Sequence, residues 1–412
     1  MDCARRRSRD HNPLSRLHIT DAGIAGITGP DRGAAGQAEQ VSSTTPQIGS
    51  TFSWPRLCGT LALAGGGGAV FAWLGVPLAW MLGAMLSVTV ASLAGAPTVM
   101  AQPLRRVMIA ILGIMLGSAF TPEILSDAQK WWPAVITMLL FVSIGTAACY
   151  VYFRKIAKFD PTTAYFSSAP GGLSEMALVG ESYGGNVAAI SLVHTTRILI
   201  VVGTIPVYFR YVQGWDVPPS PIDNGVALQW LDIVLLTGCA VVGVPLADKL
   251  KLPAGALVGP MILSAALHIA GLTHAAPPAL IVAIAQIVMG AGIGCRFSGL
   301  SLSRVGTIIL AGAGSGLLLV TGAALTAIYF ATAAGQTSEA LLLALAPGGL
   351  AEMSLIALVI GSQTAFISLM HMLRIVFVVL IVPSLFRLFA GQSLTGEDAI
   401  PSPEKPNESP GD

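Results

Sequence analysis

Charged side chains are scarce in this sequence. Only 10% of its 412 residues are Asp, Glu, Lys or Arg, whereas soluble domains carry about a quarter. So few charges cannot cover the surface of a water-soluble globule of this length, but lipid can. The formal net charge is only +1, so the chain also lacks the basic face with which a nucleic-acid-binding protein meets phosphates.

Motifs of catalysis and cofactor binding are missing as well. The sequence contains no HExxH, no Ser-His-Asp elbow and no haem motif. Its five cysteines form no CxxC pair and lie far from metal-ligand spacing with a histidine, so we interpret them as small buried side chains. Gly65–Gly68 is followed by no Lys-Ser/Thr and indicates close helix packing instead of a P-loop. The sequence therefore predicts no enzyme, no metal and no cofactor.

Apolar and small residues are abundant. Hydrophobic residues make up 54% of the chain, the mean hydropathy is +0.74, and there are 46 Gly and 26 Pro. A run of about 20 apolar residues crosses the bilayer core. We therefore predict an all-α membrane protein with ten crossings, near residues 56–74, 77–96, 104–121, 132–153, 186–209, 231–248, 253–271, 279–296, 305–331 and 363–387. Tryptophans at the ends of these spans predict an interfacial belt, with Trp54, Trp131, Trp132, Trp215 and Trp230 as members.

The composition also divides the chain. Residues 1–52 are polar, with a basic start that no apolar region follows, so we expect a disordered tail instead of a signal peptide. Two membrane repeats are expected at 53–215 and 231–390, joined by a linker at 216–230. The proline-rich segment 391–412 is expected to be a second disordered tail.

The two halves repeat each other. Residues 170–210 match residues 347–387 at a constant offset of 177, with twenty of 41 positions identical. The matches include polar residues that two apolar sequences do not share by chance, namely Glu175 with Glu352, His194 with His371, and Arg197 with Arg374. An internal duplication follows.

Each half contains Pro-Gly-Gly at membrane depth. Proline removes a backbone donor and glycine weakens a helix, so each segment is expected to be interrupted or re-entrant. Paired interruptions at matching places in two halves are typical of a transporter binding site. The candidate substrate- or ion-binding residues are Pro170, Gly171, Gly172, Ser174, Glu175, Asn186, His194, Arg197, Pro347, Gly348, Gly349, Glu352, Gln363, His371 and Arg374.

The polar candidates allow two interpretations each. Glu175 and Glu352 fall in the first turn of the helix that restarts after each break, where they can satisfy free N–H groups or bind a proton or cation. His194 and Arg197 lie on one helix face. They can lock the break to the following helix or recognise an anion. Asn186 and its match can satisfy freed backbone groups or bind a ligand.

The duplicated charges also predict contacts. Each repeat supplies one acid and one arginine, so we expect the two glutamates to be neutralised by Arg197 and Arg374, within a repeat or across the repeats. We also expect Gly171 and Gly348 to approach each other near the bilayer midplane.

Loop charges bear on whether the repeats are parallel or inverted. If each Pro-Gly-Gly segment crosses fully, each half has six crossings and the halves are parallel. If each segment returns to its own face, each half has five crossings and the repeats are inverted. The inverted arrangement puts the following basic residues on one side: Arg56, Arg105, Arg106, Arg154, Lys155, Lys158, Lys249, Lys251, Arg296, Arg304 and Arg387. The positive-inside rule then favours inverted repeats with both termini in the cytoplasm.

The doubled motifs are similar to those of a known family. "APGGLSEM" followed by "HTTRILIVVGTIP", and "APGGLAEM" followed by "HMLRIVFVVLIVP", resemble the AbrB family of bacterial integral membrane proteins over roughly residues 56–390. This family is distinct from the small DNA-binding transition-state regulators that share its name. Its members are labelled as ammonia monooxygenases or as regulators of gene expression. The pattern also resembles inverted-repeat secondary transporters with interrupted helices.

These observations predict a secondary transporter or exporter of a small solute in the bacterial inner membrane, with its site at the paired breaks. A membrane-embedded regulator that acts indirectly on gene expression is the alternative, and the ammonia monooxygenase of the family label comes third. The expected partners are the lipid bilayer and an unknown small solute, coupled to protons or sodium. Nucleic acid is not expected, and a homodimer stays open.

Overall fold

The chain folds into helices throughout the part that is described. The structure is a computed structural model, and it describes residues 53–214 and 228–393. No strand occurs within these two ranges. The predicted N-terminal tail and most of the predicted linker and C-terminal tail lie outside the described residues.

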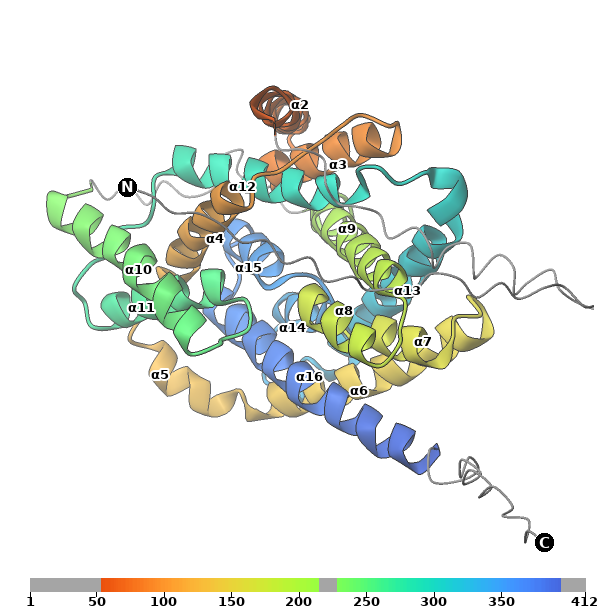
Figure 1. Cartoon of the computed structure of the whole chain (residues 1–412). Helices are drawn as coiled ribbons and strands as arrows, with labels where there is room; N and C mark the ends of the chain where they lie inside the picture. Colours follow the sequence, from red (N-terminus) through yellow and green to blue (C-terminus); the bar gives the residue numbers. More distant parts are fainter. Residues whose placement is uncertain (1–52, 215–227, 394–412) are drawn as a thin grey trace, which may run out of the picture. The chain divides into compact units, whose positions relative to one another are not determined.

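The order of helices occurs twice along the chain (Figure 1). The first half contains α2 (Trp54–Trp73), α3 (Ala79–Leu93), α4 (Gln102–Gly117), α5 (Ile124–Asp127), η1 (Ala128–Lys130), α6 (Trp132–Lys155), α7 (Pro161–Ser168), α8 (Leu173–Ser182) and α9 (Val187–Tyr211). The second half contains α10 (Trp230–Lys249), α11 (Gly255–Ile269), α12 (Ala279–Gly294), η2 (Cys295–Phe297), α13 (Leu302–Phe330), α14 (Ser338–Leu345), α15 (Leu350–Val359) and α16 (Thr364–Ser393). The starts of α7, α8 and α9 recur in α14, α15 and α16 at an offset of 177 residues.

The turns before α3 and α11 share an unusual backbone conformation. Leu78 and Ala254, which precede α3 and α11, both adopt a left-handed conformation with φ of 52°. Three residues earlier, Gly75 and Lys251 are left-handed too, with φ of 66° and 53°. A left-handed backbone is rare for residues with a side chain. Its occurrence at the same places in both halves shows that the duplication extends to backbone geometry.

Six described helices are long and apolar enough to cross a membrane: α6, α9, α10, α12 with η2, α13 and α16. All ten predicted crossings are helical. The remaining four fall on α2, α3, α4 and α11, and their crossing stays a prediction. Helices α3 and α11 have 15 residues each. At a rise of 1.5 Å per residue, such a helix is about 22 Å long, shorter than the hydrocarbon core of about 30 Å.

Helices of one half pack against helices of the other through glycine. Gly113 of α4 lies against the backbone of Leu257 in α11, and Gly290 of α12 lies against the backbone of Met81 in α3. A Cβ atom at either glycine would overlap the facing carbonyl oxygen. Small residues allow this approach of helix backbones in membrane proteins, so the two halves form one packed structure within the described residues.

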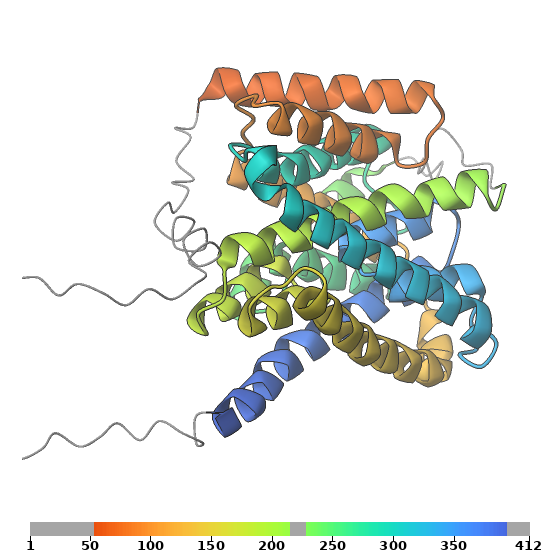
Figure 2. The same ribbon diagram turned by 90° about the vertical axis from the view of Figure 1, so that its right-hand side faces the viewer.

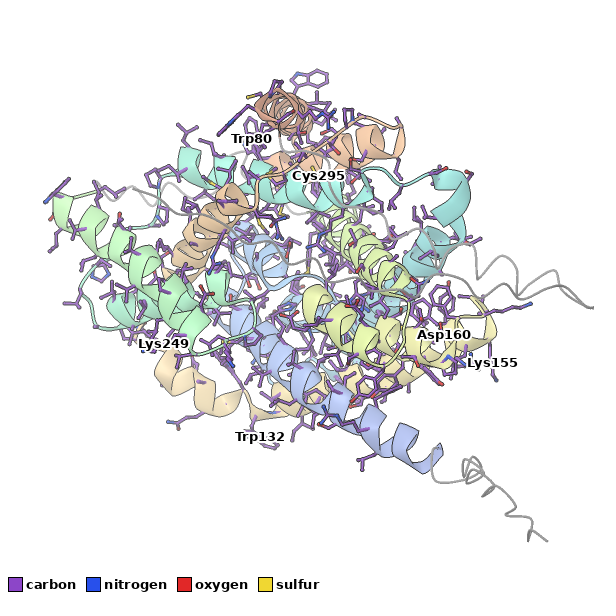
Figure 3. The ribbon with its side chains drawn as sticks, viewed as in Figure 1. Trp80, Trp132, Lys155, Asp160, Lys249 and Cys295 are labelled. Atoms are coloured by element: carbon purple, nitrogen blue, oxygen red, sulfur yellow. The ribbon has the colours of Figure 1, made fainter. Side chains whose placement is uncertain are left out.

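The outer helices present aromatic side chains. Helix α2 lies along α3 at one edge, and α9 and α13 pack side by side (Figure 2). Trp132 points outward from α6 (Figure 3), and Trp54 and Trp230 are exposed as well. Trp131 is buried instead, because its ring packs edge-on against Phe366 at 5.2 Å. The predicted belt therefore loses Trp131, and Trp215 lies outside the described residues.

Candidate functional site

Two broken helices form the centre of the candidate site. Helix α7 is separated from α8 by residues 169–172, and α14 is separated from α15 by residues 346–349. The N-cap residues Gly172 and Gly349 are extended, so the helical hydrogen-bond pattern stops at each Pro-Gly-Gly. Pro170 and Pro347 are buried. The pieces pack beside the unbroken helices α9 and α16 (Figure 1). The predicted interruption of each segment is confirmed.

The first break is held by a buried histidine and arginine of α9. His194 Nε2 lies 2.9 Å from the carbonyl oxygen of Phe166, and Arg197 Nη2 donates to the carbonyl oxygen of Ala169 at 3.2 Å. Arg197 also donates to Ser167 O at 3.5 Å and to His194 Nδ1 at 3.0 Å. Because Nδ1 accepts from Arg197, the His194 proton resides on Nε2 and the ring is neutral.

The second break repeats this arrangement with one change. His371 Nε2 lies 2.9 Å from Leu343 O, the equivalent of the first contact. Arg374 donates to Ala346 O at 2.6 Å and to Gly348 O at 2.8 Å. Arg374 therefore reaches two residues further into its break than Arg197 does, and His371 Nδ1 has no hydrogen-bond partner within the described residues.

The glutamates occupy the other end of each break. Glu175 and Glu352 are the third residues of α8 and α15, and their carboxylates fold back over Gly172 and Gly349, where a Cβ would overlap them. The Glu352 carboxylate accepts a hydrogen bond from its own backbone N–H. This position places an acid at the positive end of a helix dipole. The glycines are needed because the carboxylates take the space of a side chain.

The predicted pairing of the glutamates with Arg197 and Arg374 is wrong for this structure. The ion pairs in the described part of the chain are Arg106 with Asp248 and Lys130 with Asp127. The physical reason is that a broken helix has two ends with opposite partial charges. The arginine satisfies the carbonyls where one piece ends, and the glutamate satisfies the N–H groups where the next begins.

Both breaks meet the same helix. A Cβ at Gly171 would lie 2.7 Å from Cγ1 of Val378 in α16. Val378 follows Arg374 by one helical turn, and Arg374 holds the carbonyl of Gly348. The two Pro-Gly-Gly segments therefore contact α16 within about one turn of each other. Their depth in the bilayer stays a prediction.

The remaining candidate residues are Asn186, Gln363 and Ser174. Asn186 is the N-cap of α9, where its side-chain oxygen accepts from Ala189 N at 3.0 Å. This supports the interpretation that it satisfies freed backbone groups. Gln363 is exposed just before α16, and no hydrogen bond within the described residues joins it to either break. The Ser174 side chain lies outside the described residues.

Two arginines near Glu352 were not among the predicted site residues. Arg105 of α4 and Arg296 of η2 both interact electrostatically with Glu352, which is 6% exposed. Reasoning from duplicated residues missed them because neither is duplicated: Val282 and Ala119 stand at the equivalent positions. In the sequence analysis, their positive charge served only to predict which side of the membrane their loops lie on.

The regions beside the two breaks differ in packing. In the first half, Tyr165 packs against Phe386 with ring centroids 5.1 Å apart and against Tyr150 at 6.3 Å. Tyr165 also donates to the carbonyl oxygen of Val382 at 2.9 Å. At the equivalent place in the second half, the smaller Ala327 and Leu342 line a pocket. The first region is therefore filled by the ring of Tyr165, whereas its counterpart, which Tyr208 and Phe209 also line, keeps a small pocket.

Comparison with known proteins gives a consistent result. The family model described as "Transition state regulatory protein AbrB" matches residues 80–390. "Uncharacterized protein YhjN" of Bacillus subtilis (strain 168) is 27% identical over 354 residues, covering 80% of this chain and 91% of the relative. "Putative regulator AbrB" of Escherichia coli (strain K12) is 26% identical over 354 residues, covering 82% of this chain and 97% of the relative.

Proposed function

Because the chain belongs to the AbrB family and folds as a membrane protein with two interrupted helices, we propose that it is a secondary transporter or exporter of a small solute. The observation that carries the proposal is the meeting of both breaks on α16, next to the buried Arg374. Irregular backbone inside a membrane protein is tolerated where protein or a cavity surrounds it, and paired breaks of this kind form solute sites in transporters.

The unequal packing beside the breaks supports this function. A carrier opens its site to one side of the membrane at a time, so equivalent regions of its halves differ in any one state. Here Tyr165 and Phe386 fill one region, and a pocket lined by Leu342 lies at the other. The two arginines also bind different positions of their breaks. Both differences fit a carrier captured in a single state.

We further propose an orientation and a setting. The protein lies in the bacterial inner membrane with both termini in the cytoplasm, as the basic loops favour. It works without an enzymatic step, and protons or sodium drive the solute. Glu352 and Glu175 are the acids at the breaks that a coupling ion would meet.

The second candidate function is a membrane-embedded regulator that acts indirectly on gene expression. The observation that favours it is the name of the Escherichia coli relative, "Putative regulator AbrB". Such a protein needs a soluble partner that reads its state, and it carries no solute across the bilayer.

Transport is tested with the full-length protein in proteoliposomes. A metabolite panel is first screened for solutes that stabilise the purified protein against heat, and each hit is then offered as a labelled solute for uptake. We expect uptake above protein-free vesicles, and we expect it to be lost in Gly171→Val, which places a branched side chain against Val378. Gly203→Ala is the matched control, because a Cβ there meets nothing within 4 Å. Absence of uptake for every panel solute, together with a co-purifying soluble partner, would favour the regulator.

A further inference from the structure

We infer that the protein has a proton-binding site at His268, where the bound proton fastens the connection between α11 and α12 to the end of α11. The inference stands independently of the proposed transport function. His268 is the penultimate residue of α11 and is only 5% exposed. The connection after it spans residues 270–278 and leads into α12.

Both ring nitrogens of His268 face carbonyl oxygens. Nδ1 lies 2.8 Å from the oxygen of Ser264, and Nε2 lies 3.1 Å from the oxygen of Ala275. A carbonyl oxygen only accepts hydrogen bonds, so both nitrogens must donate. The Ser264 hydroxyl is 3.5 Å from Nδ1 but donates its proton to Ile114 O at 2.8 Å, so it cannot serve Nδ1 as a donor. A neutral imidazole carries one N–H and the charged form carries two. The geometry therefore fits the charged form, which has bound a second proton.

The other buried histidines lack this arrangement. In His194 and His371, Nε2 faces a carbonyl oxygen at 2.9 Å. Nδ1 of His194 accepts from Arg197, and Nδ1 of His371 has no hydrogen-bond partner among the described residues. One ring proton satisfies each of these two side chains. Within the described residues, His268 is thus the buried histidine whose contacts require a second proton.

Two features of the surroundings stabilise the added charge. The last turn of a helix carries partial negative charge on its free carbonyl groups, which favours a cation there. A series of hydrogen bonds also leads from His268 to an acid. Ala275 donates from its backbone nitrogen to Thr273 Oγ1 at 3.1 Å, and Thr273 donates to Asp232 Oδ1 at 2.7 Å. The series joins the end of α11 to the start of α10, and these two helices lie side by side (Figure 1).

The elements around His268 carry few other titratable groups. They are His274 of the connection, Cys239, Asp248 and Lys249 of α10, and Arg105 and Arg106 of α4. His274 is exposed, and Cys239 packs among apolar side chains. Asp248 and Lys249 lie at the end of α10, whereas Asp232 lies at its start. At that far end Asp248 pairs with Arg106. Asp232 is therefore the acid that hydrogen bonds link to His268.

The first half fastens the equivalent connection without a titratable group. With the offset of 176 residues that relates Leu78 to Ala254, the counterpart of His268 is Ser92. Ser92 Oγ and Thr98 Oγ1 share a buried hydrogen bond of 2.6 Å between α3 and the segment that follows it. Hydroxyl groups of this kind keep their proton at every physiological pH. The dependence on a second proton is thus a property of the second half.

The connection should loosen when the pH rises. Neutral His268 keeps one N–H, so one ring nitrogen then points a lone pair at a carbonyl oxygen. Either the contact to Ser264 within α11 or the contact to Ala275 in the connection is lost. The native state holds the second proton through these contacts, and the unfolded chain has none of them. The stabilisation is therefore present at low pH and is lost as the pH rises through the titration.

The protonation state is measured directly by NMR. The full-length protein in detergent carries isotope-labelled histidine, because the shifts of the ring nitrogens distinguish a charged imidazole from a neutral one. The resonance that is missing from His268→Gln identifies His268. We expect this ring to be charged at about pH 5 and to lose a proton by about pH 8, the range in which histidines titrate. His194, whose contacts need one proton, should stay neutral throughout and serves as the internal comparison.

Thermal unfolding over the same pH range tests the effect of the proton on stability. The melting temperature of the unmodified chain should fall with rising pH relative to that of His268→Gln, whose side chain donates to one carbonyl oxygen without titrating. Amide exchange in residues 270–278 should be slower in the unmodified chain than in His268→Gln at low pH, and equal at high pH. His274→Gln is the matched control, because it removes an exposed histidine of the same connection. It should keep both profiles of the unmodified chain.

Two further variants keep the test sharp. If His268→Gln does not fold, His268→Ser supplies the residue of the first half and takes its place in each measurement. Asp232→Asn still accepts from Thr273 but carries no charge, so His268 should lose its proton at a lower pH than in the unmodified chain. A residue with a merely structural role would leave that midpoint unchanged, and an unchanged midpoint would reject Asp232 as the balancing acid.

Three results would overturn the inference. A His268 ring that is neutral at about pH 5 would reject the proton-binding site, and a ring that stays charged at about pH 8 would reject its titration. Melting and exchange profiles that are the same in the unmodified chain and in His268→Gln would show that the proton does not fasten the connection.

Discussion

Arg374 donates a hydrogen bond of 2.8 Å from Nη2 to the backbone oxygen of Gly348, inside its own Pro-Gly-Gly motif. The equivalent Arg197 stops at Ala169, two residues earlier in its motif. The same sequence motif thus occurs with two different positions of the arginine contact, one in each half of the chain. The difference shows that the arginine contact to the break is not fixed by the motif alone but depends on how each half is packed.

Replacing Arg374 should strongly destabilise the protein. Arg374→Ala leaves the carbonyls of Ala346 and Gly348 buried without donors, and hydrogen bonds to charged groups contribute about 1.5–3 kcal/mol each. We expect the free energy of unfolding to fall by about 3 kcal/mol or more, measured by SDS titration in mixed micelles. Arg374→Lys keeps one donor group without the guanidinium fork. Its free energy of unfolding should lie between those of Arg374→Ala and the unmodified chain.

Arg56→Ala provides the control for this experiment, because Arg56 is exposed near the start of α2. Its unfolding free energy should stay within about 0.5 kcal/mol of the unmodified chain. An equally small effect of Arg374→Ala would show that the carbonyls of the break find other donors.

The charges at the first break should act independently. Glu175 and Arg197 sit at opposite ends of the break and form no ion pair in the structure. A double-mutant cycle with Glu175→Gln and Arg197→Gln should therefore give a coupling energy below about 0.5 kcal/mol. Unfolding in mixed micelles again supplies the free energies. A coupling of about 2 kcal/mol or more would restore the direct pairing that the charge balance of the sequence suggested.

The helical fold could be predicted from the sequence because a bilayer requires long apolar segments whose backbone groups are hydrogen-bonded within the protein. Apolar runs and the breaks at Pro170 and Pro347 follow from hydropathy and backbone chemistry, and the structure confirms the apolar helices and the breaks. The organisation into inverted repeats stays a prediction. The partners of the charges were harder to predict. Arg197 finds carbonyls instead of Glu175 because backbone groups freed by a break are invisible in a count of charges. Arg105 was missed because its electrostatic interaction with Glu352 depends on packing between helices far apart in the sequence.

Membrane topology is tested by labelling single cysteines. Asp127→Cys and Ser298→Cys lie in equivalent connections, after α4 and after α12. Arg105, near the start of α4, crosses Gly292, near the end of α12. The start of α4 therefore lies beside the end of its counterpart α12, so the two helices run in opposite directions. Inverted repeats require this arrangement. We therefore expect a membrane-impermeant maleimide to label the two cysteines from opposite faces.

The experiment needs a background in which the five native cysteines are replaced by Ala. Inside-out and right-side-out vesicles then supply the two faces. Labelling of both positions from the same face would reject the inverted arrangement and favour parallel repeats, each with a fully crossing broken helix.

The close approach of Gly171 to α16 predicts a rescue. In Gly171→Ala the new Cβ would lie 2.7 Å from Val378 Cγ1, a distance that real Cβ atoms do not show. The break or α16 must shift, and overpacking of this kind costs about 1–3 kcal/mol. Shortening the partner in Val378→Ala removes Cγ1, so the double variant Gly171→Ala with Val378→Ala should be more stable than the sum of the single effects. The measurement is the free energy of unfolding of all four proteins in mixed micelles. Additive effects would mean that the first break does not contact α16. The conclusion that both breaks contact the same helix would then be rejected.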